Sequence, residues 1–141
     1  AGSGPVGDLM NDAALPRILV VDDDPEVRAV LCELLELEGY PVAGAESGLA
    51  ALLRIGLERP GCLVLDLKLQ DVSGFEIFRT LRDCPVFEDL PVLFISGVYH
   101  DDVWIRRQLG SGPFEYLPKP VDQDDLFRVI RSLTDRRLRA A

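Results

Sequence analysis

The sequence predicts an α/β fold: a doubly wound parallel sheet of five strands with five helices. Three observations lead to this prediction. The 141 residues suffice for one domain with a single core. Short apolar runs alternate with longer segments whose apolar residues recur at helical spacing. The links between them are short, which is typical of parallel strands joined by helices that cover both faces of the sheet.

Four strongly apolar runs and one weaker run supply the strands. A continuous apolar run that stops abruptly is typical of a strand buried on both faces. The weaker run contains Pro41, which favours a position near an edge of the sheet. The predicted strands, in chain order, are 18–21, 40–44, 62–65, 91–95 and 114–117.

Helix signals fill the intervals between the strands. Asp24 caps the first helix, with Pro25 at its first position and Gly39 at its end. Ser73 caps the third helix, with Glu76 three residues later as in a capping box. The other predicted helices are 46–58, 101–109 and 121 to about 136. The residues expected to face inward from the first two helices are Val27, Val30, Leu31, Leu34 and Leu35, then Leu49, Leu52, Leu53 and Leu57.

Composition narrows the class of protein. Fifteen Lys and Arg residues against 24 Asp and Glu residues give a net charge of −9, which argues against direct nucleic-acid binding. No apolar run approaches the roughly 20 residues of a membrane span, and no signal peptide is visible, so we expect a cytoplasmic protein. Three cysteines without a CxxC pair, Cys32, Cys62 and Cys84, favour buried thiols.

The expected domain organisation has three parts. Residues 1–16 form a flexible lead, and its first five residues look like an expression scar. Residues 17–136 form the folded domain. Residues 137–141 are a C-terminal tail or the start of a linker, since the basic end suits either a helix terminus or a connection.

Polar side chains follow the apolar strands at the points where those strands end. Asp22 and Asp23 follow the first, Asp66 the third, Ser96 the fourth, and Lys119 lies just beyond the fifth. Singly, each is typical of a turn, a cap or a solvated surface. Because the carboxyl ends of parallel strands meet at one edge, where ligands bind in such folds, we expect these side chains to lie together.

This combination favours phosphoryl chemistry with a divalent cation. Clustered carboxylates repel one another, and a bound cation relieves that repulsion. Mg²⁺ takes one or two carboxylates, waters and a phosphate oxygen. A carboxylate beside it is a candidate nucleophile toward a phosphoryl group. Lys119 and Ser96 would then contact phosphoryl oxygens.

Four stretches resemble the receiver domain of bacterial two-component response regulators, over residues 17–136. They are ILVVDDDPEVR (18–28), CLVLDLKLQDVSG (62–74), PVLFISG (91–97) and FEYLPKP (114–120). The resemblance implies a flavodoxin-like (CheY-like) sheet of order 2-1-3-4-5. It implies Mg²⁺ as cofactor, a histidine kinase or phosphotransfer protein as phosphodonor, and a downstream output domain or partner. Weak autodephosphorylation is also implied, without classification as an enzyme.

The same resemblance assigns roles to individual residues. Asp66 is the implied phosphoacceptor, assisted by Lys119 and Ser96. Ser96 and Tyr116 form the implied switch. A homodimer through the fourth helix, fifth strand and fifth helix is a further expectation. The implied metal ligands are Asp22, Asp23, Asp66 and the backbone carbonyl of Lys68.

The sequence departs from the family pattern at three positions. Gln70 replaces a proline in the loop after the acceptor, so we expect a less rigid loop. Lys68 occupies a position that tunes phosphoryl lifetime in the family. Pro118 restricts the residue before it. The Lys119–Pro120 bond is cis in the family, and the same is expected here.

Other readings carry less weight. A haloacid-dehalogenase phosphatase would need Thr or Val where Glu26 stands, and an EF-hand loop would need Gly where Val27 stands. A receiver-fold docking module that works without phosphorylation stays open. Trp104 and Tyr99 mark either a docking surface or internal packing, and His100 is expected at the surface.

Overall fold

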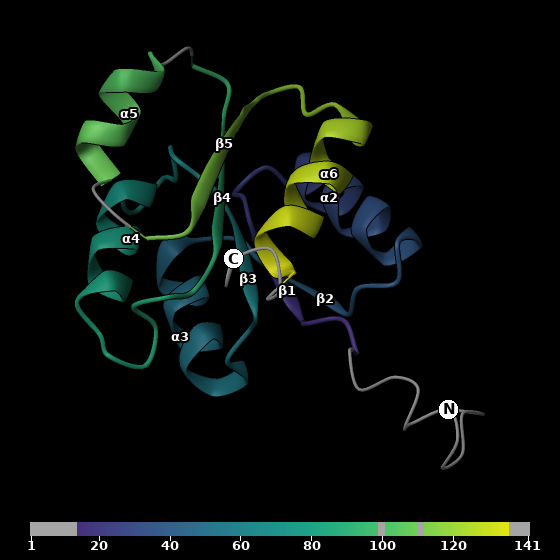
Figure 1. Cartoon of the computed structure of the whole chain (residues 1–141), viewed down its shortest axis with the longest axis horizontal. Helices are drawn as coiled ribbons and strands as arrows, with labels where there is room; N and C mark the ends of the chain where they lie inside the picture. Colours follow the sequence, from purple (N-terminus) through teal and green to yellow (C-terminus); the bar gives the residue numbers. More distant parts are fainter. Residues whose placement is uncertain (1–13, 99–100, 110–111, 136–141) are drawn as a thin grey trace.

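The computed structural model describes residues 14–98, 101–109 and 112–135, which form a five-stranded parallel sheet between two layers of helices (Figure 1). The strand order is β2-β1-β3-β4-β5, so the predicted 2-1-3-4-5 order is confirmed. The strands are β1 (Ile18–Val21), β2 (Val42–Ala45), β3 (Cys62–Asp66), β4 (Val92–Ser96) and β5 (Phe114–Pro118). The helices are α2 (Pro25–Leu37), α3 (Gly48–Glu58), α4 (Gly74–Arg82), α5 (Asp102–Leu109) and α6 (Gln123–Thr134).

The sheet separates two hydrophobic cores. Helices α3, α4 and α5 cover one face, and α2 and α6 cover the other (Figure 1). Strand β1 contributes to both, because successive side chains point to opposite faces. Leu19 and Val21 join the core under α3, α4 and α5, and Ile18 and Val20 join the core under α2 and α6. Burial on both faces explains the continuous apolar runs.

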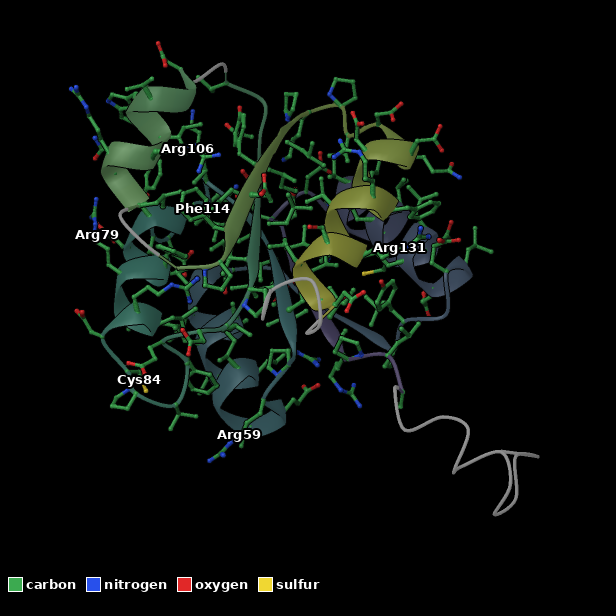
Figure 2. All side chains as sticks on the ribbon, in the orientation of Figure 1. Arg59, Arg79, Cys84, Arg106, Phe114 and Arg131 are labelled. Atoms are coloured by element: carbon green, nitrogen blue, oxygen red, sulfur yellow. The ribbon has the colours of Figure 1, made fainter. Side chains whose placement is uncertain are left out.

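An aromatic group fills the core beneath α4 and α5. The ring of Phe94 lies 5.2 Å from that of Phe78 and 6.1 Å from that of Phe114, both edge to face. The guanidinium of Arg106 lies over the Phe114 ring, 5.5 Å from its centroid, and Figure 2 labels both side chains. Trp104 is 42% exposed and packs its ring edge-on against Phe75 at 5.6 Å. Trp104 therefore packs against its own domain, which was one of the two alternatives expected for it.

Element boundaries agree with the predictions to within two residues. The Asp24 side chain accepts from the backbone N–H of Glu26 at 2.9 Å, and that of Ser73 accepts from Phe75 at 3.1 Å, so both predicted caps are confirmed. Two helices begin two residues later than predicted, because Ser47 caps α3 and Asp122 caps α6. A cap residue adopts extended backbone, and the helix can begin only after it.

The predicted inward face of α3 is wrong for three of its four leucines, while the fourth, Leu52, is partly buried against the core. Leu49, Leu53 and Leu57 are 66%, 61% and 83% exposed, and the buried positions are instead Gly48, Ala51 and Ile55. The segment is apolar on nearly every side, so the spacing of leucines does not define which face packs on the sheet. The smaller residues allow the helix to lie close to the strands.

A milder correction applies to α2. Leu31 and Leu35 are buried as predicted, but Val30 is 54% exposed.

The structure also bears on the predictions for the cysteines and for membrane-spanning segments. Cys62 is buried as predicted, while Cys32 and Cys84 are only partly buried, and all three are free thiols. Burial and the charge of Glu36 raise the pKa of the Cys32 thiol. No helix within the described ranges is long and apolar enough to cross a membrane. Tyr99 and His100 lie outside the described residues.

Candidate functional site

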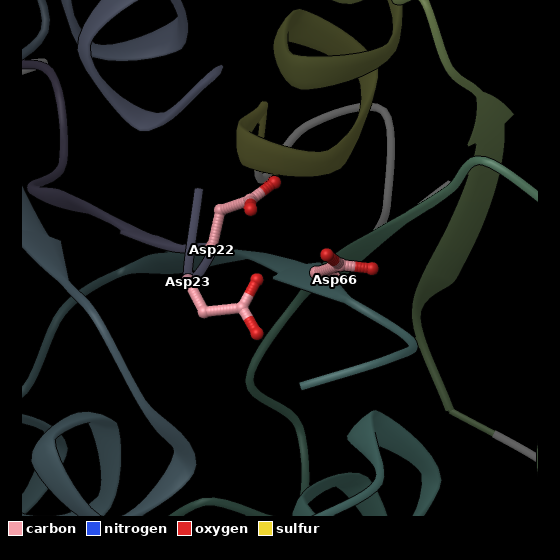
Figure 3. A group of neighbouring side chains, drawn as sticks. All are labelled: Asp22, Asp23 and Asp66. Carbon is pink, nitrogen blue, oxygen red and sulfur yellow. The ribbon is translucent and has the colours of Figure 1, made fainter. Parts of the chain in front are cut away.

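Three carboxylates converge at the carboxyl edge of the sheet. Asp22 and Asp23 follow β1, and Asp66 ends the neighbouring strand β3 (Figure 3). Each contributes a carboxylate oxygen to a group in which these atoms lie within 4.8 Å of one another. Asp22 and Asp66 are buried, and Asp23 is partly exposed. The structure therefore brings together the three acids that the strand ends predicted.

Backbone hydrogen bonds hold Asp22 at the end of β1. Its N–H donates to the carbonyl of Ala45 at 3.2 Å, which extends the pairing with β2 by one residue. Its side chain accepts from the N–H of Asp24 at 2.9 Å, and Arg28 donates to its carbonyl at 2.7 Å. The carboxylate is therefore oriented by the turn that starts α2.

Lys119 bridges two of the buried acids. Its Nζ lies 2.8 Å from Asp22 Oδ2 and 3.0 Å from Asp66 Oδ2. It donates a hydrogen bond to Asp66, whereas the contact with Asp22 is an ion pair without hydrogen-bond geometry, which leaves Asp22 Oδ2 with no hydrogen bond from the described residues. The Lys119–Pro120 bond is cis, as expected.

The ammonium and the carboxyl perturb each other's ionisation. Burial raises the pKa of Asp66, and this outweighs the lowering by the Lys68 N–H and by Lys119. Burial alone would lower the pKa of Lys119, but its contacts with Asp22 and Asp66 outweigh burial and raise it. The contacts of Lys119 therefore favour its charged form, whereas burial makes ionisation of Asp66 less favourable.

The group suits a hard divalent cation. Three carboxylates facing one ammonium leave an uncompensated negative charge at a partly buried position. Asp22 Oδ2 is a buried oxygen that lacks a hydrogen bond from the described residues, and the side-chain donor set is entirely oxygen. These are the ligands Mg²⁺ prefers, with waters completing its shell. The residues present therefore fit the metal that the sequence predicted.

The loop after β3 wraps tightly around Asp66. The N–H of Lys68 donates to Asp66 Oδ1 at 3.0 Å, and the Lys68 side chain is exposed. Gly74, the first residue of α4, lies so close that an added Cβ would sit 2.6 Å from the Asp66 carbonyl oxygen. Only glycine permits this approach. Gly74 ends the 62–74 motif but was not among the predicted site residues.

Ser96 and Tyr116 share an acceptor. Ser96 Oγ donates to the carbonyl of Val98 at 3.2 Å and accepts from the Val98 N–H at 3.1 Å. The Tyr116 hydroxyl donates to the same carbonyl at 3.3 Å. Strands β4 and β5 are also joined at this edge, since the Lys119 N–H donates to the Ser96 carbonyl at 2.8 Å. The two residues expected to form a switch are therefore linked through one carbonyl.

Asp71 is a second residue that sequence analysis did not assign to the site. Its carboxylate accepts from the N–H groups of Gly48 and Leu49, which begin α3. No local signal could have found this contact, because it joins residues more than 20 positions apart in the chain.

A hollow of about 950 Å³ lies at the opposite edge of the sheet. Its lining includes Gly61, Pro91 and Pro113, which directly precede β3, β4 and β5. It therefore lies at the amino ends of these strands, away from the acidic group.

Comparisons with known proteins agree with this geometry. A family model described as the response regulator receiver domain matches residues 18–131. Response regulator MprA of Mycobacterium ulcerans is 40% identical over 121 residues, which cover 85% of this chain and 50% of the relative. The MprA of Mycobacterium tuberculosis strain H37Ra has the same identity, with 51% of its length covered. The chain thus spans about half the length of these curated relatives.

Solved structures give the same picture. The CheY-like receiver domain from Methanospirillum hungatei has a TM-score of 0.79 and 28% identity, and the match covers 90% of this chain and 99% of that one. The Francisella response regulator 1452 receiver domain has a TM-score of 0.77 and 27% identity, over 86% of this chain and 98% of that one.

Proposed function

This chain belongs to the response regulator receiver domain family, and we propose that within two-component signalling it accepts a phosphoryl group on Asp66. The donor is a histidine kinase or a phosphotransfer protein that presents phosphohistidine. The observation that carries the proposal is the contact of Lys119 Nζ with Asp22 and Asp66 beside a third carboxylate. A charge arrangement of this kind is suited to phosphoryl transfer, which depends on positioning and charge neutralisation.

Mg²⁺ would be held by Asp23 and Asp66 directly, by Asp22 through water, and by the backbone carbonyl of Lys68. When bound, the cation neutralises charge on the phosphoryl oxygens. The buried Asp22 Oδ2, which has an ion pair with Lys119 but no hydrogen bond from the described residues, and the oxygen-only donor set support this assignment.

The transfer itself requires a carboxylate nucleophile and a positively charged group that stabilises the negative charge of the phosphoryl oxygens. An Asp66 oxygen attacks phosphorus in line, an O–P bond forms, and the P–N bond to the donor imidazole breaks. The bonding electron pair leaves with the imidazole nitrogen. Lys119 already donates a hydrogen bond to Asp66. After transfer, its ammonium can donate to an oxygen of the phosphoryl group instead. Slow attack by water on phosphorus then breaks the O–P bond to Asp66 and releases inorganic phosphate, which returns the free carboxylate, so the domain acts as a timed switch and not as a classified enzyme.

The switch follows from the shared acceptor at Val98. A phosphoryl group on Asp66 offers Ser96 Oγ a charged acceptor, and charged acceptors make the stronger hydrogen bonds. Ser96 then leaves the Val98 carbonyl, which also accepts from Tyr116. Tyr116 rotates inward, and the face made by α5, β5 and α6 changes. A downstream output domain, a partner protein or a second copy reads this face, as a shift between two populations.

Intact mass spectrometry tests the assignment. With acetyl phosphate and Mg²⁺ the protein should gain about 80 Da, the mass of one phosphoryl group. Asp66→Asn should gain nothing, and chelation of Mg²⁺ should abolish the gain in the unaltered protein. An equal gain in Asp66→Asn would refute Asp66 as acceptor. No gain in either protein would favour a docking module that works without phosphorylation. We place this activity in the cytoplasm, where histidine kinases present their phosphohistidine.

A further inference from the structure

We propose that Asp71 is a positioning residue: it fastens the loop after the phosphoacceptor to the start of helix α3, and so holds the Lys68 carbonyl where a metal can use it. The inference rests on the proposed function, because it concerns the same site. The tie would offset part of the rigidity expected to be lost with Gln70 in place of the proline typical of the family.

The contact is a two-oxygen cap on a neighbouring helix. Asp71 Oδ1 accepts from the N–H of Gly48 at 2.9 Å, and Oδ2 accepts from the N–H of Leu49 at 3.0 Å. The first N–H groups of a helix have no partner within it, and a carboxylate is the favoured acceptor there. These bonds, together with bonds to the backbone N–H groups of Asp71 and Val72, lower the pKa of Asp71. The side chain is therefore ionised and engaged at neutral pH.

The helix start is shaped to receive the loop. A Cβ on Gly48 would overlap the side chain of Val72 and would also approach that of Ile77, so a larger residue at this position would require these side chains to move. Ser47 separately caps α3 by accepting from the Ala50 N–H at 3.0 Å. The end of α3 thus has a cap of its own, and Asp71 is an added one that belongs to the loop.

The rest of the loop is pinned by backbone contacts nearer its base. The N–H of Leu67 donates to Ile95 at 3.0 Å, and the N–H of Gly74 donates to Leu67 at 3.0 Å. A bridge joins Lys68 to Ser73. Between them, Gln70 and Asp71 form the exposed tip.

Within the described residues, the hydrogen bonds that tie this tip to another element are those of Asp71. The apolar side chains of the loop have an anchor of their own, because Leu69 is 7% exposed in the core and Val72 packs against that core. Loss of the Asp71 tie would therefore loosen the exposed tip without releasing the whole loop. The Lys68 carbonyl lies two residues before this tip, and residues that hold a metal ligand in place matter nearly as much as the ligand. We expect Asp71→Ala to weaken Mg²⁺ binding about tenfold, at the low end of such losses.

Calorimetric titration of Mg²⁺ into the unphosphorylated protein provides the test. Ser47→Ala is the matched control, because it removes one hydrogen bond from the same helix start and leaves the loop untouched. Both variants should lower the melting temperature, whereas only Asp71→Ala should raise the Kd for Mg²⁺. Asp71→Asn keeps one acceptor oxygen and should give an intermediate Kd. This third variant also serves if Asp71→Ala does not fold.

The outcomes separate the two proposals. Equal Mg²⁺ affinity in Asp71→Ala, Asp71→Asn and Ser47→Ala would overturn the inference and reduce Asp71 to a helix cap. Mg²⁺ binding that depends on Asp71, in a protein that gains no phosphoryl mass, would support the inference while the proposed function fails. A parent protein that binds no Mg²⁺ would overturn both.

Discussion

Removing the Lys119 ammonium should destabilise the domain by about 3 kcal/mol at pH 7 without Mg²⁺. The ammonium lies 2.8 and 3.0 Å from two buried carboxylates, and its side chain is only 22% exposed. At an effective dielectric constant near 20, each pair attracts by about 6 kcal/mol, and desolvation of the lysine offsets much of this. Loss of one partner from a buried group costs about 3–5 kcal/mol, and partial exposure places Lys119→Met at the lower end.

Urea unfolding of Lys119→Met, with Lys68→Met as control, measures this cost. Lys68 is the other lysine of the chain, and its side chain is exposed. Its replacement should change the free energy of unfolding by less than about 0.5 kcal/mol. Adding Asp66→Asn to Lys119→Met should recover most of the loss, because one of the two uncompensated charges is gone. Saturating Mg²⁺ should recover stability as well, because ligand binding favours the folded state.

The pH dependence has a definite sign. The raised pKa of Lys119 means that its stabilisation is complete below the ordinary lysine pKa and is lost as pH rises through the folded value. Asp66 also has a raised pKa, so its ionisation costs folded-state stability, and acid relieves that cost. The deficit of Lys119→Met should therefore shrink as pH falls from 7 and Asp66 takes up a proton. A deficit below about 0.5 kcal/mol at pH 7, or one unchanged by Asp66→Asn, would refute the charge argument.

Three further predictions concern packing and ionisation. Gly74→Ala should cost at least about 2 kcal/mol by urea unfolding, because its Cβ would sit 2.6 Å from the Asp66 carbonyl oxygen; a change below half of that would contradict the tight approach. Leu53→Ser should change the free energy of unfolding by less than about 0.5 kcal/mol, whereas Ile55→Ala should lower it by about 2–4 kcal/mol. A larger loss in Leu53→Ser than in Ile55→Ala would mean that α3 packs on its leucine face. The pKa of the Asp71 carboxyl, measured by NMR titration, should lie below the ordinary aspartate range. The stability that its hydrogen bonds supply should be present above that range and should be lost as pH falls through the lowered pKa. An ordinary aspartate pKa would contradict the cap.

Element order and site composition were predictable because their signals are local. Buried parallel strands need continuous apolar runs, and Asp24 and Ser73 cap helices within three residues of themselves. The acids were predictable from their place at strand ends, since the topology of a parallel sheet brings those ends together. The packing of α3 was not predictable, because its segment is apolar almost all round and only the shape of the sheet selects the face.

The sequence by itself determined the family and the identity of the acidic group, since both follow from residues in fixed places along the chain, and the strand order came with the family resemblance. Tertiary structure alone decided how those residues are held. Asp71 meets Gly48 across 23 positions, and Ser96 meets Tyr116 at one carbonyl. Such contacts depend on distances through space between segments with no local pattern in common. They decide how firmly the loop and the Ser96–Tyr116 pair are held, and with that how the site would respond to the proposed phosphorylation.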